Sequence, residues 1–502
     1  MLGEGARPEA SECNACTALL NVHLLIRIFS NMNERIAAIP TPAAGETALP
    51  AMLEKMRHYF NSGATRSYDF RKKQLQKIRQ AVRQNETAIA EALYGDLKKS
   101  PEEAYASETG LLLAEIRVTL NSLRKWMRPQ RVGTDLANFP SSATIYRDPL
   151  GVVLIIAPWN YPLQLLLIPM IGAIAGGNCV VLKPSEAAPA TAALIEKIIG
   201  ACFDEVYIKV VQGDGAAVVP AMMNAFRFDH IFYTGSVPVG KSIYRLAAEK
   251  LVPVTLELGG KSPAIVEEDA DITRAAKRIV LGKFINTGQT CVAPDYVLVH
   301  TAVKDKLVEA LKATIQQFYG ENTTGSYDYG RIINARRFDK LVSYLGQGRV
   351  LYGGQYDKNE LFMAPTLVEP DADSPLMTEE IFGPVLPIVS FQTHAQARHM
   401  VERNPNPLAF YLFTASAKKE QEWINAVPFG GGCINNTAWY FTNHHLPFGG
   451  VGNSGMGAYH GKYTFDTFTR PKPVMKTPNW FDPALKYPPF RGKLKLFKWL
   501  IR

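Results

Sequence analysis

Short apolar runs alternate with helical segments between residues 152 and 258, and this alternation limits the fold more than any other feature. The runs are Val152–Ile156, Cys179–Leu182, Tyr207–Val211, His230–Tyr233 and Val254–Leu258. The helical segments between them are Leu163–Ile174, Ala188–Ala201, Ala216–Ala225 and Val239–Lys250. A largely β-branched run without alternation is typical of a parallel strand that is buried on both faces. The pattern predicts a doubly wound parallel sheet, with functional residues just after its strands.

The segments on either side extend this α/β prediction. From Leu53 to Trp126 the sequence is helical in pattern, and Pro101 is its only proline. From Asp269 to about Phe429 a second cycle of strands and helices predicts a second α/β domain. Residues 1–47 carry an acidic, interrupted apolar stretch that fits no targeting signal, and we expect a disordered extension outside the fold.

Composition and charge exclude several classes of protein. Apolar residues make up 47% and charged residues 20%, which excludes a wholly disordered or fibrous chain. Six cysteines in 502 residues fit a reduced, cytoplasmic protein better than a disulfide scaffold. No charged residue occurs between Asp148 and Lys183, but prolines at 158, 162 and 169 make this stretch a buried core and not a membrane span.

The net charge of +9 is concentrated at one end of the chain. Six basic residues and no acidic one lie from Lys486 onward, which leaves +3 on the remainder. A basic tail on a nearly neutral body indicates a surface or partner contact and does not indicate a nucleic-acid-binding protein. Cys13 and Cys16 form a CxxC with no second pair at metal-binding spacing, so we expect no metal site.

Two glycine patterns compete as the nucleotide site. Gly450, Gly452 and Gly455 have the GxGxxG spacing, but no strand precedes them and no helix follows, so we expect a flexible, closely approached loop. Gly235–Gly240 directly follows a strand and opens a helix, whose N-terminus could bind a phosphate. A plain glycine–serine start to a helix is the alternative. Lys183 and Glu186 lie at another strand end and could hold ribose hydroxyls, or form an ordinary solvated pair.

Three further residues near predicted strand ends or in loops could carry chemistry together. Cys291 could be a nucleophile or a small buried apolar residue. Glu257 ends a strand, where it could act as a base or form a surface salt bridge. The amide of Asn160 could stabilise an oxyanion, or bond its own backbone in a loop. A thiol, a base and an amide donor suit acyl chemistry through a thioester.

Seven motifs in the same order along the chain resemble the aldehyde dehydrogenase family. They are Pro158–Pro162, Lys183–Glu186, Gly235–Gly240, Leu256–Lys261, Gly288–Cys291, Glu379–Pro384 and Leu446–Gly457. The resemblance covers about residues 48 to 475 and is strongest to class 3, which includes fatty and aromatic aldehyde dehydrogenases. The spacing of 34 residues from Glu257 to Cys291 supports this class.

The resemblance implies a role for each motif residue. Cys291 would be the nucleophile, Glu257 the base, and Asn160 with the backbone N–H of Cys291 the oxyanion site. The cofactor residues would be Lys183 and Glu186 at the adenine-side ribose, Gly235, Ser236 and Gly240 at the pyrophosphate, and Glu380 and Phe382 at the nicotinamide. Val237 stands where the family usually has threonine, which changes a detail of cofactor binding only.

The resemblance also implies how the chain is divided. The NAD(P)-binding domain would comprise residues 48–134 and 149–256, and the catalytic domain residues 257–439. A small β element of residues 135–148 and 440–473 would bridge two subunits of a homodimer. Residues 474–502 would be a basic amphipathic tail, which could lie on an anionic membrane surface or cap the substrate entrance.

The expected reaction is NAD(P)-dependent oxidation of an aldehyde to its carboxylic acid through a cysteine thiohemiacetal and thioester. Tyr161, Trp439, Tyr440 and Phe441 would line a pocket for medium or long aliphatic chains or aromatic aldehydes. Glu186 favours NAD, while the class often accepts NADP as well. The alternatives are an acylating enzyme that passes the acyl group to coenzyme A or phosphate, and a non-catalytic protein on the same fold. The presence of both Cys291 and Glu257 argues against these alternatives.

Overall fold

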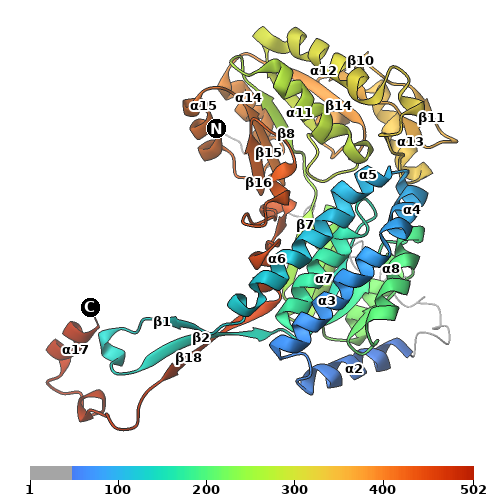
Figure 1. Ribbon diagram of the computed structural model, residues 1–502. Helices are drawn as coiled ribbons and strands as arrows, with labels where there is room; N and C mark the ends of the chain where they lie inside the picture. Colours follow the sequence, from blue (N-terminus) through green and yellow to red (C-terminus); the bar gives the residue numbers. More distant parts are fainter. Residues whose placement is uncertain (1–47, 502) are drawn as a thin grey trace, which may run out of the picture. The chain divides into compact units, whose positions relative to one another are not determined.

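A computed structural model describes residues 48–501 (Figure 1). The predicted extension and its CxxC pair lie outside these residues. The chain first forms helices α2 (Ala48–Asn61), α3 (Tyr68–Gln84), α4 (Glu86–Leu97), α5 (Pro101–Ala104) and α6 (Gly110–Trp126). Ser67 caps α3 by accepting a hydrogen bond from the Phe70 N–H, and Ser100 caps α5 in the same way with Glu103.

A six-stranded sheet follows, in the order β17-β7-β6-β3-β4-β5. Its strands are β3 (Val152–Ile156), β4 (Cys179–Lys183), β5 (Ile208–Val210), β6 (His230–Gly235), β7 (Val254–Leu258) and β17 (Gly455–Met456). Its crossover helices are α7 (Gln164–Gly176), α8 (Pro189–Cys202), α9 (Gly215–Ala225) and α10 (Val237–Glu249). All strand pairs are parallel except β17 with β7, so the predicted doubly wound parallel sheet is confirmed.

The charge-free segment is the core of this domain. Every residue of β3, β4 and α7 is buried, which explains why neither strand shows polar alternation. Helix α7 packs against α3 and α6, which closes it off from solvent. Among residues 48–501, none of the helices has the length and apolar character needed to cross a membrane.

A second, seven-stranded sheet has the order β10-β13-β14-β9-β8-β15-β16. Its strands are β8 (Pro263–Val266), β9 (Tyr296–His300), β10 (Gly348–Tyr352), β13 (Thr366–Pro370), β14 (Val385–Phe391), β15 (Ala409–Phe413) and β16 (Gly431–Ile434). The strands β11 (Tyr356–Asp357) and β12 (Phe362–Met363) pair separately. The helices are α11 (Ile272–Phe284), α12 (Lys304–Tyr319), α13 (Ala335–Ser343), α14 (His394–Glu402) and α15 (Ala417–Ala426). This sheet and its helices form the expected second α/β domain.

A small antiparallel sheet joins distant parts of the sequence. It contains β1 (Gln130–Val132), β2 (Ser142–Pro149) and β18 (Thr469–Lys476), in the order β1-β2-β18. After its first residue, β18 is exposed throughout. Helix α16 (Lys462–Thr467) precedes β18, and helix α17 (Leu494–Leu500) lies near the end of the chain.

The glycine-rich segment from Gly449 to Gly457 departs from the prediction in one respect. It is not a loop throughout, because Gly455 and Met456 form β17 and pair with β7, with Gly455 opposite Glu257. The predicted close approach is confirmed: a Cβ at Gly455 would lie 2.0 Å from the Leu256 carbonyl oxygen. The segment therefore lies against the strand that carries Glu257.

Candidate active site

A tight turn after α11 places Cys291. Asn286 and Thr287 have left-handed backbone angles, with φ of 51° and 55°, and Gly288 follows with φ of 73°. A Cβ at Gly288 would lie 2.3 Å from the Gly383 carbonyl oxygen, so only glycine fits there. Cys291 emerges from this turn partly exposed, whereas Thr290 and Val292 are buried. The position suits a reacting thiol better than a core residue.

Side-chain amides hold the turn rigidly. The Gln289 Nε2 group donates to the carbonyl oxygens of Asn286 and Arg331 at 3.1 and 3.0 Å, and its Oε1 accepts from the Ile333 N–H at 3.0 Å. The Asn286 Nδ2 group donates to the carbonyl oxygens of Gln289 and Asn160. These two side chains lie in or beside a recognised motif, but no sequence pattern indicates their partners.

Asn160 reaches the same turn from the end of β3. Its Nδ2 atom donates to the Gln289 carbonyl oxygen at 3.0 Å, two residues before Cys291. The interpretation of Asn160 as a loop residue that bonds its own backbone is therefore wrong. Nδ2 carries two hydrogens, and within residues 48–501 only this one acceptor binds it. The second N–H has no acceptor within these residues.

A buried ion pair that the sequence did not reveal supports Asn160. Lys99 and Glu108 have fully buried side chains, and their Nζ and Oε1 atoms lie 2.6 Å apart. Lys99 Nζ also donates to the Asn160 carbonyl oxygen at 3.1 Å. Glu108 Oε2 accepts from the backbone N–H groups of Leu163 and Gln164 at 2.9 and 3.3 Å, at the start of α7. The pair fixes the segment that follows β3.

Glu257 lies in β7 with 2% of its surface exposed. Neither carboxylate oxygen has a hydrogen-bond partner within residues 48–501, and no salt bridge is formed there. The surface or salt-bridged alternative for this residue is therefore wrong. Burial raises the pKa of Glu257 well above its ordinary value, because a charged carboxylate loses its hydration. The raised pKa makes the Glu257 carboxylate a stronger base than an exposed one.

The thiol and the acidic groups influence one another. Burial raises the pKa of Cys291 to about 12, and the charges of Glu380 and Glu257 contribute to this rise. The backbone N–H groups of Cys291 and Val292 act in the opposite direction by favouring the thiolate. Glu257, Glu380 and Cys291 thus interact electrostatically, and a negative charge on either carboxylate disfavours the thiolate.

The segment from Gly235 to Gly240 suits a phosphate. Gly235 ends β6, Ser236 precedes the first turn of α10, and the Ser236 side chain makes no capping hydrogen bond. The first N–H groups of this helix, apart from the position of Pro238, are thus not capped by that side chain. A Cβ at Gly240 would lie 2.6 Å from Leu258 Cδ2, so glycine keeps the helix close to β7.

Lys183 and Glu186 form a pair that is more than an ordinary solvated one. Lys183 Nζ is buried and lies 2.9 Å from Glu186 Oε2, while half of the Glu186 side chain is exposed. Glu186 Oε1 accepts a hydrogen bond from the Gly215 N–H at 3.4 Å. A buried cation that presents an accessible carboxylate at a strand end fits the hydroxyl groups of a ribose.

Glu380 and Phe382 lie just before Gly383, whose carbonyl oxygen approaches Gly288 in the turn that precedes Cys291. Glu380 Oε1 accepts from the Gly260 N–H at 3.2 Å. Burial, with the charge of Asp295, raises the pKa of Glu380 to about 7. Phe382 has a positive φ of 50°. Its ring packs edge to face against the Trp159 ring, with 5.5 Å between the ring centroids.

The predicted aromatic residues divide into two groups. Tyr161 is buried, and its hydroxyl lies 2.7 Å from Thr290 Oγ1, next to Cys291. Trp439 and Phe441 stack on each other, and Trp439 is 37% exposed. Tyr440, between them, is buried, and its pKa is raised by burial first and then by nearby groups that include Cys291 and Glu257.

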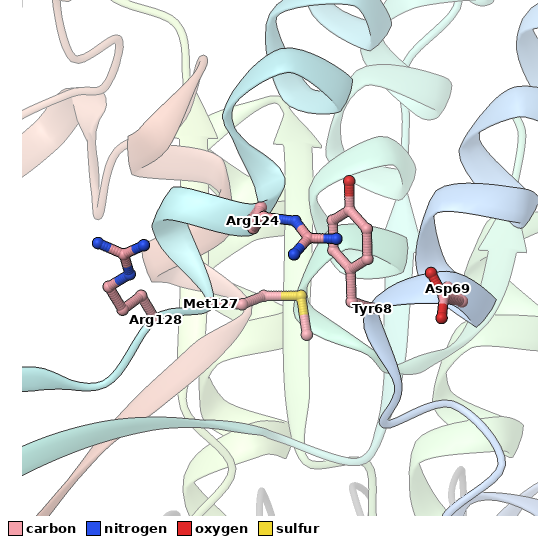
Figure 2. A pocket seen from close by; sticks show the side chains of 5 residues that line it. All are labelled: Tyr68, Asp69, Arg124, Met127 and Arg128. Atoms are coloured by element: carbon pink, nitrogen blue, oxygen red, sulfur yellow. The ribbon is translucent and has the colours of Figure 1, made fainter.

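Tyr459 is buried beside the same groups, and sequence analysis missed it. Burial raises its pKa well above the ordinary value, and the charges of Glu257 and Cys291 add to the effect. It lies just beyond the recognised glycine run. By contrast, a surface pocket lined by Tyr68, Asp69, Arg124, Met127 and Arg128 contains none of the predicted site residues (Figure 2).

Comparison with known proteins decides the family. The model of the aldehyde dehydrogenase family matches residues 29–474. The chain belongs to the aldehyde dehydrogenase family. It is 47% identical to 4,4'-diaponeurosporen-aldehyde dehydrogenase of Staphylococcus aureus over 443 residues, covering 88% of this chain and 96% of that one. It is 43% identical to aldehyde dehydrogenase family 3 member B1 of Rattus norvegicus over 444 residues, covering 88% and 94%.

The solved structure of the substrate-bound state of Staphylococcus aureus AldH agrees. Its TM-score with this chain is 0.88 at 45% identity, and the match covers 90% of this chain and 99% of that one. The class 3 resemblance and the fold class are confirmed. This aldehyde dehydrogenase oxidises an aldehyde to a carboxylic acid, as its family does with NAD(P).

Proposed function

We propose that Cys291, Glu257 and Asn160 perform the oxidation in the roles of nucleophile, base and oxyanion donor. The observation that carries the proposal is the hydrogen bond from Asn160 Nδ2 to the Gln289 carbonyl oxygen, two residues before Cys291. The unpaired, buried carboxyl of Glu257 supports it, because such a group can both take and release a proton.

The steps follow from these groups. The Cys291 thiol loses its proton to Glu257, and its sulfur attacks the aldehyde carbon to form a thiohemiacetal. The carbonyl oxygen becomes an oxyanion that accepts hydrogen bonds from Asn160 Nδ2 and the Cys291 N–H. A bound nicotinamide would supply the acceptor for the hydride that the carbon loses. Glu257 passes the proton it took from Cys291 to solvent water, which restores its carboxylate. The carboxylate then deprotonates a water, which attacks the resulting thioester, and the carbon–sulfur bond breaks to release the acid and the Cys291 thiolate.

NAD is the proposed preferred cofactor. Glu186 is the acceptor for a ribose hydroxyl, and its negative charge would repel the 2′-phosphate of NADP. Gly235, Ser236 and Gly240 would face the pyrophosphate, and Glu380 and Phe382 the nicotinamide ribose and ring. The uncapped start of α10 supports the first assignment. Because Lys183 partly neutralises the charge of Glu186, the repulsion of the 2′-phosphate is reduced and some turnover with NADP is expected.

The proposed substrates are medium or long aliphatic aldehydes and aromatic aldehydes. The support comes from Tyr161 beside Thr290 and from the aromatic run Trp439–Phe441. The Staphylococcus aureus relative is named for the oxidation of 4,4'-diaponeurosporen-aldehyde.

The test is absorbance at about 340 nm, which reports reduced nicotinamide. NAD and NADP are tried separately with aldehydes from acetaldehyde to hexadecanal and with benzaldehyde, beside Cys291→Ala. We expect turnover that rises with chain length, favours NAD and vanishes in the variant. Turnover that requires coenzyme A or phosphate would favour the acylating alternative, and cofactor binding with no turnover of any aldehyde would favour the non-catalytic one.

The proposed assembly is a homodimer through the small sheet. Its edge strand β18 is exposed, and it carries Val474 and Met475 at 42% and 53% exposure. The unpaired backbone groups of an exposed edge strand can pair with another chain, and Val474 and Met475 form the apolar part of β18, beyond Pro471 and Pro473. Light scattering after size exclusion should give twice the chain mass, and Val474→Lys should shift it toward the monomer. A monomeric wild type would refute this assembly.

The proposed location of the protein is the cytoplasm. Its C-terminal tail is proposed to make a peripheral contact with an anionic membrane surface. Helix α17 exposes Leu494 and Trp499 beside Lys495 and Lys498, a combination suited to lipid headgroups. Co-sedimentation with phosphatidylserine vesicles should fall when residues 493–502 are deleted. Unchanged sedimentation, with altered KM for long aldehydes, would favour a cap over the substrate entrance.

A further inference from the structure

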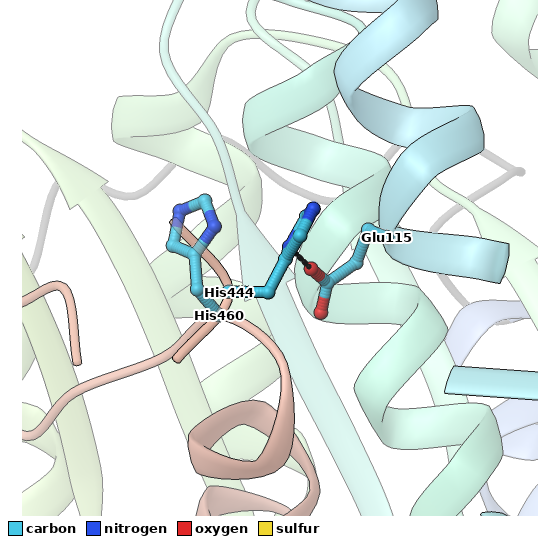
Figure 3. Close-up of side chains that lie close together, drawn as sticks. All are labelled: Glu115, His444 and His460. Atoms are coloured by element: carbon cyan, nitrogen blue, oxygen red, sulfur yellow. Dashed lines mark hydrogen bonds and ion pairs between the residues drawn. The ribbon is translucent and has the colours of Figure 1, made fainter. Parts of the chain in front are cut away.

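Two histidines and a glutamate meet outside the catalytic set. Glu115 comes from α6, His444 from the segment after Thr442, and His460 from the segment before α16. One ligand atom from each residue, an imidazole nitrogen or a carboxylate oxygen, lies within 4.8 Å of the other two. His444 Nδ1 and Glu115 Oε2 are 2.9 Å apart (Figure 3). None of these residues was singled out from the sequence.

The group is buried, and its charge is not balanced by a fixed cation. Glu115 is 0% exposed and His460 is 4% exposed. Within residues 48–501 the only ion-pair partner of Glu115 is His444, and no lysine or arginine reaches it. A buried carboxylate normally requires a cation or several donors, since desolvation of its charge is costly.

Surrounding groups hold the three side chains in place. Glu115 Oε1 accepts from the Gly461 N–H at 2.8 Å and from Thr464 Oγ1 at 3.5 Å, while Oε2 lies 2.9 Å from His444 Nδ1. The backbone N–H of His460 donates to Thr464 Oγ1 at 2.8 Å. Such supporting hydrogen bonds to ligand residues are a regular feature of metal sites.

The backbone at this point is strained. His460 has φ of 79°, and Gly461 has φ of 55°. A Cβ at Gly461 would lie 2.4 Å from the His444 carbonyl oxygen, so only glycine allows the two histidine segments to approach. Left-handed angles at a non-glycine residue cost about 1–3 kcal/mol and are retained where the geometry is used.

We propose that Glu115, His444 and His460 bind one divalent transition-metal ion, with zinc preferred. Two imidazoles and a carboxylate are a set of three protein ligands that zinc uses, with water in the fourth position. Zinc bonds of about 2.0–2.2 Å place tetrahedral ligands roughly 3.4 Å apart, which small side-chain rotations from the present spacing can reach. The hydrogen bond between His444 and Glu115 would then be replaced by bonds to the ion.

The ion would act as a structural clamp. It would tie α6 to the chain from His444 to His460, which contains the glycine-rich segment 449–457. Gly455 of that segment pairs with Glu257 in β7. The proposal is independent of the reaction mechanism, since none of its three ligands has a catalytic role in that mechanism.

The test uses the full chain, stripped with a chelator and titrated with zinc alone by calorimetry. Every variant is made in a Cys291→Ala background, which removes the catalytic thiol as a competing ligand. We expect one zinc per chain and a rise in Tm of about 3 °C at a hundredfold excess over Kd. Glu115→Gln and His460→Gln should weaken binding at least ~100-fold, because even the loss of a group that only supports a ligand costs about 10–100-fold.

His445→Gln is the matched control, since His445 is exposed next to His444 and should bind zinc within ~3-fold of the background protein. Cobalt added to the unsubstituted stripped protein should give a tetrahedral visible spectrum without a sulfur charge-transfer band, which needs no ligand variant to fold. Equal zinc affinity in the ligand variants and the control would overturn the proposal. A site lost on Cys291→Ala alone would also overturn it and place the ion at the thiol.

Discussion

Replacement of Lys99 by methionine should damage both stability and catalysis, because Lys99 joins a buried ion pair to the oxyanion site. Methionine keeps much of the side-chain volume but removes the charge. Glu108 would then be a carboxyl with no counter-ion at 0% exposure. Breaking a buried pair from one side costs about 3–5 kcal/mol. At about 2.1 cal/mol/K per residue, this 502-residue chain has an unfolding entropy of about 1 kcal/mol/K, so Tm should fall roughly 3–5 °C.

The catalytic effect follows from a separate contact. Lys99 Nζ donates to the Asn160 carbonyl oxygen at 3.1 Å, while Asn286 Nδ2 donates to the same oxygen at 2.9 Å. One of two donors remains, so Asn160 should stay near its position with less restraint. We expect kcat to fall about 10-fold, with a smaller change in KM, since loss of an oxyanion donor altogether costs about 10²–10³-fold.

A double variant separates the lost contact from the stranded charge. Lys99→Met with Glu108→Gln leaves no buried ion, and the side-chain carbonyl of the introduced glutamine can still accept from the Leu163 N–H. Its Tm should lie above that of Lys99→Met, as neutral replacements of buried pairs are often tolerated. Scanning calorimetry and initial rates at about 340 nm measure both quantities. A Lys99→Met protein with a Tm within about 1 °C of wild type and unchanged kcat would refute the reasoning.

Three further changes probe other parts of the site. Asn160→Ala should lower kcat about 10²–10³-fold with little change in Tm, and a loss below about 5-fold in steady-state assays would exclude the oxyanion role. The KM for NAD should fall as pH rises through about 7, because Glu380 then loses its proton and becomes an acceptor for ribose hydroxyls. Glu380→Gln should flatten that profile, and a wild-type profile without a step near pH 7 would contradict this. Gly455→Ala should lower Tm by several degrees and reduce kcat, since its Cβ would meet the Leu256 carbonyl oxygen behind Glu257; calorimetry and rates equal to wild type would contradict the contact.

The sequence predicted the first sheet well because its strands are buried on both faces. Both ends of the strand Val152–Ile156 agree with the prediction. Strand β4 is one residue longer than predicted, because Lys183 also pairs with the neighbouring strand. Helix α10 begins at Val237, two residues earlier than predicted, because Pro238 is compatible with a first helical turn. Local patterns of polarity, together with proline and glycine positions, are sufficient to predict these strand and helix ends.

Contacts between distant segments could not be predicted in the same way. Lys99 and Glu108 look like surface charges on a helical stretch, and only the approach of Asn160 and α7 makes them a buried pair. Glu257 was expected at a strand end, but the lack of hydrogen-bond partners for its carboxylate within residues 48–501 depends on what packs over β7. The requirement for glycine at position 461 likewise arises from the close passage of His444. Each property requires the partner segment to be in place.

The central claim is that the acyl group passes through Cys291 and is released by Glu257. The most direct measurement is the intact mass of the Glu257→Gln protein after mixing with NAD and an aldehyde, followed by peptide mapping. Glutamine can neither accept the thiol proton nor activate the water, so the thioester should form slowly, during a long incubation, and then persist. We predict an added acyl group on the peptide that contains Cys291, and none in a protein that also carries Cys291→Ala. Acid release at the wild-type rate, or an acyl group attached to another residue, would contradict the account.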